Sequence, residues 1–240
     1  MNLVTDAIAW LTSGEQWSGD RALHVLMLQH LWLTLLSVAA AAALALPAGW
    51  LIGHTGRGRE IAVAISGAAR AIPSFGLLIL LVLLFGVLHK PEAAIVTFVI
   101  LAIPSLLAGA YSGLEAIDRA TIDAARAVGM SEWQIFLRVE LPLGLPLLVG
   151  GVRSAALQVV ATVTIAAYIN LGGLGLPIIT GLALRRYDMI LGAALLVAVV
   201  ALVLDALLGL AQRRAEPRGL RTDTTTSLRG SREPAAAPRH

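Results

Sequence analysis

Charged and polar side chains are rare in the apolar parts of this chain, so those that occur there are its first candidates for chemistry. Arg153 and Asp205 each interrupt an apolar stretch. A charge at the centre of a bilayer is unfavourable by about 2.5–3.5 kcal/mol on insertion scales, so an opposite charge at similar depth is a natural partner. We expect Arg153 and Asp205 to form an intramembrane charge pair, in preference to a direct role in binding solute.

The stretch that contains Arg153 also carries polar residues at intervals of four or eight, namely Ser154, Gln158, Thr162 and Asn170. On an α-helix each four-residue step turns by only about 40°, so these side chains are expected on one broad polar stripe. Such a stripe can line a translocation pathway, with the ring of Tyr168 at its outer end placed to contact a cation. Interhelical hydrogen bonding uses the same residues, and the pattern favours neither interpretation.

A polar insert over residues 115–142 separates two apolar stretches. Asp118 can cap a first helix, Gly129 can end it, and Ser131 can cap a second helix from Glu132 to about Glu140. We expect a helix–turn–helix that contacts a soluble partner, in which small alanines allow the partner to approach closely. An amphipathic loop that only stabilises the bundle is the alternative. The candidate contact residues are Asp123, Ala124, Ala125, Gly129, Met130, Ser131, Glu132, Trp133 and Pro142.

No group of residues in this sequence suggests an enzyme. The chain has no cysteine, its five histidines are scattered, and no nucleophile, base and acid occur together. Gly172, Gly173 and Gly175 resemble a phosphate-binding loop only superficially, because no strand precedes them and no lysine follows, and a tight turn fits better. The sequence predicts no catalytic, cofactor-binding or metal-binding residue.

Composition assigns these residues to a membrane domain. Hydrophobic residues make up 58% of the 240 residues and charged residues 14%, whereas soluble domains carry about 25% charge. Strand-like alternation is absent, so the fold class is all-α integral membrane. The net charge of +3 arises in residues 212–240, which contain seven arginines and only three carboxylates. We expect a disordered tail that contacts membrane lipid and no nucleic acid.

Apolar runs of about 20 residues predict five membrane spans. The predicted spans are 31–52, 61–88 (interrupted by Arg70 and Pro73), 93–114, 147–169 and 190–211. Residues 1–22 form an extracytoplasmic N-terminal segment whose Trp10 and Trp17 suit a membrane interface. Residues 23–211 form the transmembrane domain, and residues 212–240 form the tail.

Lys and Arg counts in the connecting segments predict the orientation. Cytoplasmic segments are enriched in these residues. One set of connections holds nine of them: Arg57, Arg59, Arg119, Arg126, Arg138, Arg213, Arg214, Arg218 and Arg221. The other set holds four: Arg21, Lys90, Arg185 and Arg186. The first set is therefore expected in the cytoplasm, with the N-terminus outside, the C-terminus inside and the 115–142 insert in the cytosol.

The insert also matches a known signature. It reads Asp123-Ala124-Ala125, three residues, Gly129, nine residues, Val139, one residue and Leu141-Pro142. This resembles the "EAA" signature of permease subunits of binding-protein-dependent ABC importers, although Asp123 replaces the usual Glu and Val139 the usual Ile. Further segments resemble the osmoprotectant branch: Gln29-His30-Leu31, Ile72-Pro73-Ser74, Ile103-Pro104-Ser105, Leu141-Pro142-Leu143, Gly172-Gly173-Leu174-Gly175 and Pro217-Arg218-Gly219-Leu220.

The resemblance implies a five-span type I ABC importer transmembrane domain, similar to the methionine permease. It implies a second permease subunit, identical or related, an extracytoplasmic solute-binding protein, and separate ATPase subunits that bind ATP and grip the 115–142 insert. The implied solute is glycine betaine, choline, carnitine or proline. Alternatives are a permease for another small solute such as methionine, or an ion-gradient-driven transporter in which Arg153, Asp205 and the polar stripe form the coupling site.

Overall fold

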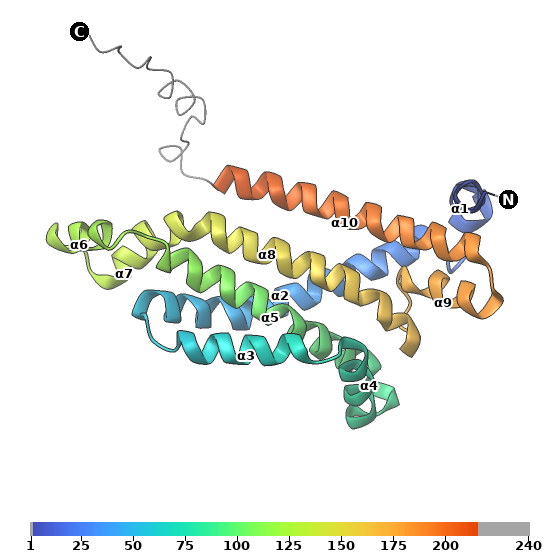
Figure 1. Cartoon of the computed structure of the whole chain (residues 1–240), viewed down its shortest axis with the longest axis horizontal. Helices are drawn as coiled ribbons and strands as arrows, with labels where there is room; N and C mark the ends of the chain where they lie inside the picture. The colour runs from blue at the N-terminus through green and yellow to red at the C-terminus, as the bar shows by residue number, and fades with distance from the viewer. Residues whose placement is uncertain (1, 216–240) are drawn as a thin grey trace, which may run out of the picture.

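Long apolar helices dominate the computed structural model, which describes residues 2–215 and contains only helices among its regular elements there. The longest are α2 (Leu23–Thr55), α5 (Lys90–Glu115), α8 (Leu141–Val163) and α10 (Tyr187–Ala215). Each is, or belongs to, a helical run long and apolar enough to cross a membrane. These four helices run side by side along the long axis of the molecule (Figure 1).

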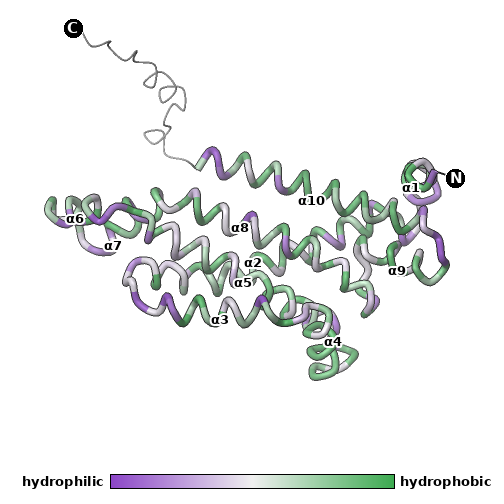
Figure 2. Tube along the Cα trace, viewed as in Figure 1, coloured by the Kyte–Doolittle hydropathy of each residue, from purple (hydrophilic) through white to green (hydrophobic). Residues whose placement is uncertain are grey.

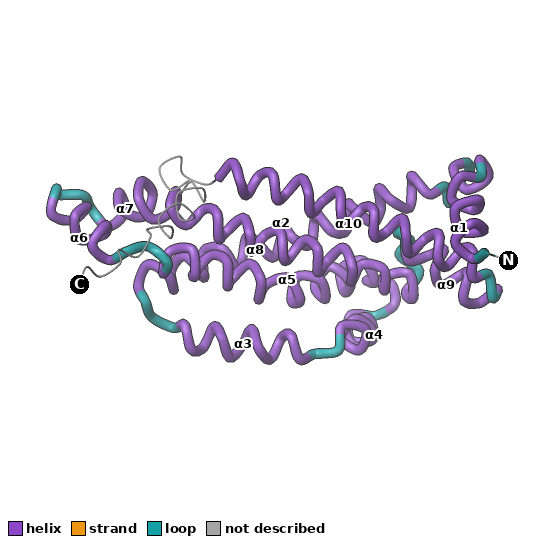
Figure 3. The backbone as a smooth tube through the Cα atoms, turned by 45° about the horizontal axis from the view of Figure 1, so that its top comes forward, coloured by secondary structure: helices purple, strands orange, loops and turns teal. Residues whose placement is uncertain are grey.

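The fifth predicted span, 61–88, is not one straight helix. It consists of α3 (Arg59–Ala71) and α4 (Ser74–Phe85), which meet at an angle of 88°. Pro73 lacks a backbone N–H and disfavours a helical conformation at the residue before it, and Ile72 is extended accordingly. Five spans are therefore reached when this bent pair counts as one, and Figure 3 shows α3 and α4 beside the main bundle.

α2, α5 and α10 extend past their predicted ranges, whereas α8 begins and ends earlier than its predicted range. Capping residues, which hydropathy does not take into account, contribute to these differences. Gly56 ends α2 in a left-handed conformation (φ +68°), and its N–H donates to the Ile52 carbonyl. Pro91 lies in the first turn of α5 and Pro142 in that of α8, where the missing N–H costs no hydrogen bond. α10 continues to Ala215, so residues 212–215 are helical, and the rest of the predicted tail lies outside the described residues.

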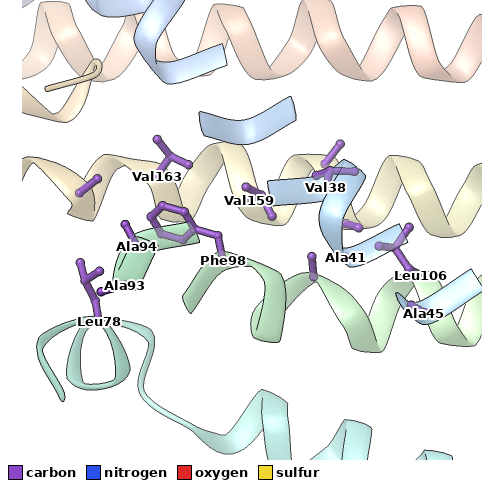
Figure 4. Packing of buried hydrophobic residues seen from close by; sticks show 14 of the residues in the cluster. Val38, Ala41, Ala45, Leu78, Ala93, Ala94, Phe98, Leu106, Val159 and Val163 are labelled. Carbon is purple, nitrogen blue, oxygen red and sulfur yellow. The ribbon is translucent and has the colours of Figure 1, made fainter. Parts of the chain in front are cut away.

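The core of the bundle forms where α5 packs against α2 and α8. Phe98 is fully buried there, between small and branched side chains that include Ala41, Ala94 and Val159 (Figure 4). Glycines allow the helices to cross closely. A Cβ at Gly109 would lie 2.7 Å from the Gly151 Cα, and one at Gly113 would lie 2.6 Å from the Gly144 carbonyl oxygen. Small residues at crossings are the usual means of tight packing between membrane helices.

Short helices occupy the two ends of the bundle, where polar residues gather (Figure 2). α1 (Leu3–Thr12) and α9 (Gly175–Leu184) lie at one end, and α6 (Arg119–Ala127) and α7 (Glu132–Ile135) lie at the other (Figure 1). α10 runs from the first end towards the second. The two ends of the described chain therefore lie on opposite sides of the bundle.

The N-terminal segment packs more closely than its sequence predicts. Trp10 is only 5% exposed, and a Cβ at Gly192 in α10 would lie 2.5 Å from its ring. Trp10 therefore fills a helix contact, and its depth at a membrane interface stays a prediction. Trp17 remains exposed, and its Nε1–H donates to the Leu11 carbonyl at 2.7 Å.

Candidate functional site

The polar insert folds as a hairpin, residues 117–140, whose first half follows the sequence prediction. Asp118 accepts a hydrogen bond from the Ala120 N–H at 3.0 Å and so caps α6. Gly129 adopts φ +85° after the last turn. Its N–H donates to the Arg126 carbonyl, and the Met130 N–H donates to the Ala125 carbonyl. This pair of bonds is the Schellman ending that glycine favours.

The second half of the hairpin begins as predicted but does not end as a separate helix. Ser131 and Gln134 form a reciprocal capping box at the start of α7. A π-helical turn, Phe136–Glu140, then leads directly into α8. The predicted end of the second helix near Glu140 is therefore absent, and one helical run continues from Glu132 to Ile169. As a result, the hairpin joins a membrane helix without a loop between them.

The hairpin has its own small core. Ile122, Ala125 and Ile135 are buried in it, with Met130 and Val139 packed against them. Ala125 is only 8% exposed, so it holds the two halves of the hairpin together and is not open to a partner. Ala124 lies on the outer face. Of the two alanines expected to admit another chain, the structure therefore leaves only one accessible.

The outer face of the hairpin combines charges with exposed apolar groups. Val128 is 78% exposed and Trp133 67%. Arg126 donates to both carboxylate oxygens of Glu132 at 2.8 and 3.0 Å and to Asp123 at 3.3 Å. Hydrogen bonding and charge attraction from Glu132 raise the pKa of Arg126. Gly129, Ser131 and Pro142 are also exposed, whereas Met130 is half-buried.

Sequence reasoning missed the polar contact between the hairpin and α2. His54, in the last turn of α2, lies 2.6 Å from Glu140 through Nδ1 and 3.7 Å from Glu132 through Nε2. Beside this contact lies a hollow of about 410 Å³, lined by residues of α2 and of the hairpin that include Trp50, Trp133 and Phe136. The sequence did contain a signal for this contact. His54 and Glu140 each lie at the end of an apolar run, and both of these ends are predicted to lie on the same side of the membrane.

The structure brings Arg153 of α8 and Asp205 of α10 together. The guanidinium makes two hydrogen bonds to the carboxylate, from Nε at 2.5 Å and from Nη2 at 2.7 Å. Gly209 provides the space for this pair, since a Cβ there would lie 3.4 Å from Arg153 Nη1. Both charges are thus matched in a two-point geometry that favours Arg–carboxylate pairs.

The predicted polar stripe is shorter than its spacing suggests. Ser154, Gln158 and Thr162 share one face of α8, and Gln158 accepts a hydrogen bond from Ser105 at 3.4 Å. The α-helix ends at Val163 and continues as a 3₁₀ segment, Thr164–Ile169. The four-residue spacing consequently does not place Tyr168 and Asn170 on this stripe.

Tyr168 and Asn170 lie near the end of the bundle opposite the hairpin. The Tyr168 ring packs edge-on against Phe75 of α4, with centroids 4.9 Å apart. Asn170 adopts φ +61°, a conformation that asparagine tolerates better than most residues. It lines a hollow of about 310 Å³ with polar residues that include Asp20, Arg21 and Gln29.

The glycine run after Asn170 is a turn held by α2. Gly172 and Gly173 have φ of +78° and +73°. The Gln29 side chain accepts a hydrogen bond from the Gly173 N–H at 3.2 Å. The buried His30 ring accepts from the Leu174 N–H at 3.3 Å and lies 2.9 Å from the Val160 carbonyl. A ring protonated at Nε2 satisfies both contacts, so His30 joins α2, α8 and the turn.

Comparison with known proteins places this geometry in context. The family described as "Binding-protein-dependent transport system inner membrane component" matches residues 45–220. The chain is 33% identical to the carnitine transport permease protein OpuCB of Listeria monocytogenes, over 80% of this chain and 88% of that protein. It is 34% identical to the osmoprotectant import permease protein OsmW of Salmonella typhimurium, over 82% of this chain and 93% of that protein.

Among solved structures, the chain is similar to a subunit of the MetNI methionine ABC transporter in an inward-facing conformation. The TM-score is 0.68, with 22% sequence identity, and the match covers 88% of this chain and 98% of that one. At this level of identity the similarity shows a shared fold. The bundle, the bent α3–α4 pair and the hairpin thus form the architecture of an ABC importer permease.

Proposed function

Because the chain belongs to the family of binding-protein-dependent transport system inner membrane components, we propose that it forms the translocation pathway of an ATP-driven importer for quaternary-amine osmoprotectants. Membership of this family and the apolar helices make it a multi-pass permease of the bacterial inner membrane. The single observation that carries the choice of solute is the similarity, over about four-fifths of the chain, to permeases named for carnitine and osmoprotectant import.

The hairpin is proposed as the contact for a separate ATPase subunit that binds ATP. Its exposed Val128 and Trp133, next to the charged group of Asp123, Arg126 and Glu132, offer the mixed surface typical of protein interfaces. The remaining contact residues are Ala124, Gly129, Met130 and Ser131, whereas Ala125 and Pro142 act by shaping the hairpin and the start of α8. This contact requires the hairpin in the cytoplasm, and therefore the N-terminus outside.

The rest of the assembly follows from the same proposal. A second permease subunit, identical or related, would complete the pathway, and an extracytoplasmic solute-binding protein would deliver the solute at the end formed by α1 and α9. Ser154, Gln158 and Thr162 are proposed to line the pathway, with Tyr168 and Asn170 near its outer mouth. Because Arg153 and Asp205 neutralise each other, they support the bundle better than they would support ion coupling.

Uptake in the native host tests this function. Cells that lack this gene are expected to lose most ATP-dependent uptake of radiolabelled glycine betaine, carnitine or choline, and a plasmid copy should restore it. Depletion of ATP should stop the restored uptake, whereas collapse of the proton and sodium gradients should not. Restored uptake of methionine alone would reassign the solute. Uptake that stops with the ion gradients but survives ATP depletion would instead favour a gradient-driven transporter.

A further inference from the structure

A buried carboxylate marks the junction between the hairpin and α8. Glu140 is only 4% exposed and lies at the end of the π-helical turn Phe136–Glu140. Its partner among the described residues is His54 of α2, with Nδ1 2.6 Å from Oε2. A buried carboxylate needs such a partner, because loss of hydration is otherwise uncompensated. This contact therefore joins α2 to the point where the hairpin becomes a membrane helix.

His54 has negative groups on several sides. Its Nε2 lies 3.7 Å from Glu132, which in turn binds Arg126 of α6. Each ring nitrogen of His54 therefore faces one carboxylate, and the ring lies in a polar chain formed by Arg126, Glu132, His54 and Glu140.

Apolar packing around this polar chain is incomplete. The hollow of about 410 Å³ lies between Pro47, Trp50 and Leu51 of α2 and Trp133 and Phe136 of the hairpin. Phe136 meets Trp50 edge-on, with ring centroids 5.8 Å apart, and meets the His54 ring in the same way at 6.1 Å. Because a hollow separates much of the two surfaces, the contacts of His54 add a polar connection to the edge contact between Trp50 and Phe136.

From these contacts we infer that His54 is a positioning residue that locks the hairpin to α2, so that displacement of the hairpin by the ATPase moves α2 together with α8. The hairpin is continuous with α8 but reaches α2 only through side chains. Without the lock, the hairpin end of α2 would lose its polar connection to the hairpin, while the core packing between α2 and α8 would remain. This inference rests on the proposed function, because it concerns how the same hairpin transmits force.

Transport and ATP hydrolysis, measured together in proteoliposomes that contain the complete importer, test the lock. His54→Ala and Glu140→Gln are each expected to lower the solute imported per ATP by roughly fivefold or more, as expected for loss of a charge-assisted hydrogen bond, while hydrolysis continues. The double variant should be no worse than either single variant. His54→Lys should restore part of the ratio. The matched control is His89→Ala, an exposed histidine at the other end of the bundle.

A distance measurement tests the lock independently of transport. The chain has no cysteine, so spin labels can be attached at Thr55→Cys in α2 and Ala127→Cys in the hairpin, both exposed positions. The distance distribution should be narrow in the otherwise unaltered protein and in His89→Ala, and broad in His54→Ala. If His54→Ala does not assemble, His54→Gln takes its place, because it removes the ring and keeps a polar side chain.

The outcomes distinguish failure of the His54 lock from failure of the proposed importer function. An unchanged ratio of solute to ATP in His54→Ala, or an unchanged distance distribution, would overturn the lock and leave the importer assignment intact. A loss of assembly in His54→Ala, His54→Gln and His54→Lys alike would also overturn it, in favour of a purely structural contact. An unaltered protein without ATP-dependent uptake would overturn the proposed function, whereas broadening in His54→Ala would still support the mechanical link.

Discussion

Two of the charges inside the apolar helices, Arg153 and Asp205, form one pair. Arg153 and Asp205 come from helices that lie side by side, and Nε and Nη2 of Arg153 donate to the two carboxylate oxygens of Asp205. Because 52 residues separate them in the chain, no local sequence pattern predicts their contact. Their similar depth in two apolar runs does predict it. The pairing was therefore predictable from sequence, whereas the space that Gly209 leaves for the guanidinium was not.

Removal of one member of this pair should be worse than removal of both. Arg153→Ala leaves the Asp205 carboxylate unpaired within an apolar helix, whereas Arg153→Ala combined with Asp205→Ala leaves no charge behind. We expect the single variant to show lower transport and a lower unfolding temperature of the purified protein than the double variant. Additive losses in the double variant would contradict the pairing.

At the scale of the elements, glycines bring α5 and α8 into a close crossing that sequence reasoning did not predict. Gly109 and Gly113 of α5 meet Gly151 and Gly144 of α8 almost backbone to backbone. The spacing of the two α5 glycines, four residues apart, is the pattern associated with tight crossings in membranes. Sequence reasoning located the helices by hydropathy, and hydropathy contains no information about which faces touch. The crossing of α5 with α8 therefore came only from the structure.

A bulky side chain at the α5–α8 crossing should separate these helices. Gly109→Val introduces a Cβ within 2.7 Å of Gly151, and overpacking of this kind costs about 1–3 kcal/mol or more. We expect a lower unfolding temperature and a lower yield of folded protein in detergent. Gly67→Val is the matched control, because that glycine is helical and has nothing within 4 Å of its Cβ position. Equal effects of the two variants would contradict the crossing.

The turn of the hairpin depends on one backbone conformation. Gly129 has φ +85°, which costs a residue with a side chain about 1–2 kcal/mol. Gly129→Val should distort the turn and reduce co-purification of the ATPase, whereas Gly129→Asn should reduce it much less, because asparagine tolerates positive φ. Retention of the ATPase measured by affinity purification checks this order, and equal retention by both variants would count against it.

Sequence analysis described the hairpin well up to Ser131 and less well after it. Asp118, Gly129 and Ser131 act locally, through caps and a left-handed turn, so short-range rules predicted them. The continuation of α7 into α8 depends on a π-helical turn and on Glu140 meeting His54 across the bundle. Long-range contacts of that kind have no short-range pattern.

At the scale of the whole molecule, composition and apolar run lengths predicted a helical membrane domain of five spans. The bend of 88° between α3 and α4 changes one of these spans into a broken one. The hairpin and the α1–α9 pair lie at opposite ends of the bundle (Figure 1). The proposed contacts with an ATPase and with a solute-binding protein therefore lie at opposite ends of the bundle.

The side of the membrane that the hairpin faces is the most direct test of this arrangement. Because the chain has no cysteine, Ala124→Cys on the hairpin and Glu15→Cys at the opposite end are single labelling sites. A membrane-impermeant maleimide is expected to label Ala124→Cys only in inside-out vesicles and Glu15→Cys only in right-side-out vesicles. Labelling of Ala124→Cys from the outside would place the hairpin beyond the reach of any cytoplasmic ATPase and would contradict the account.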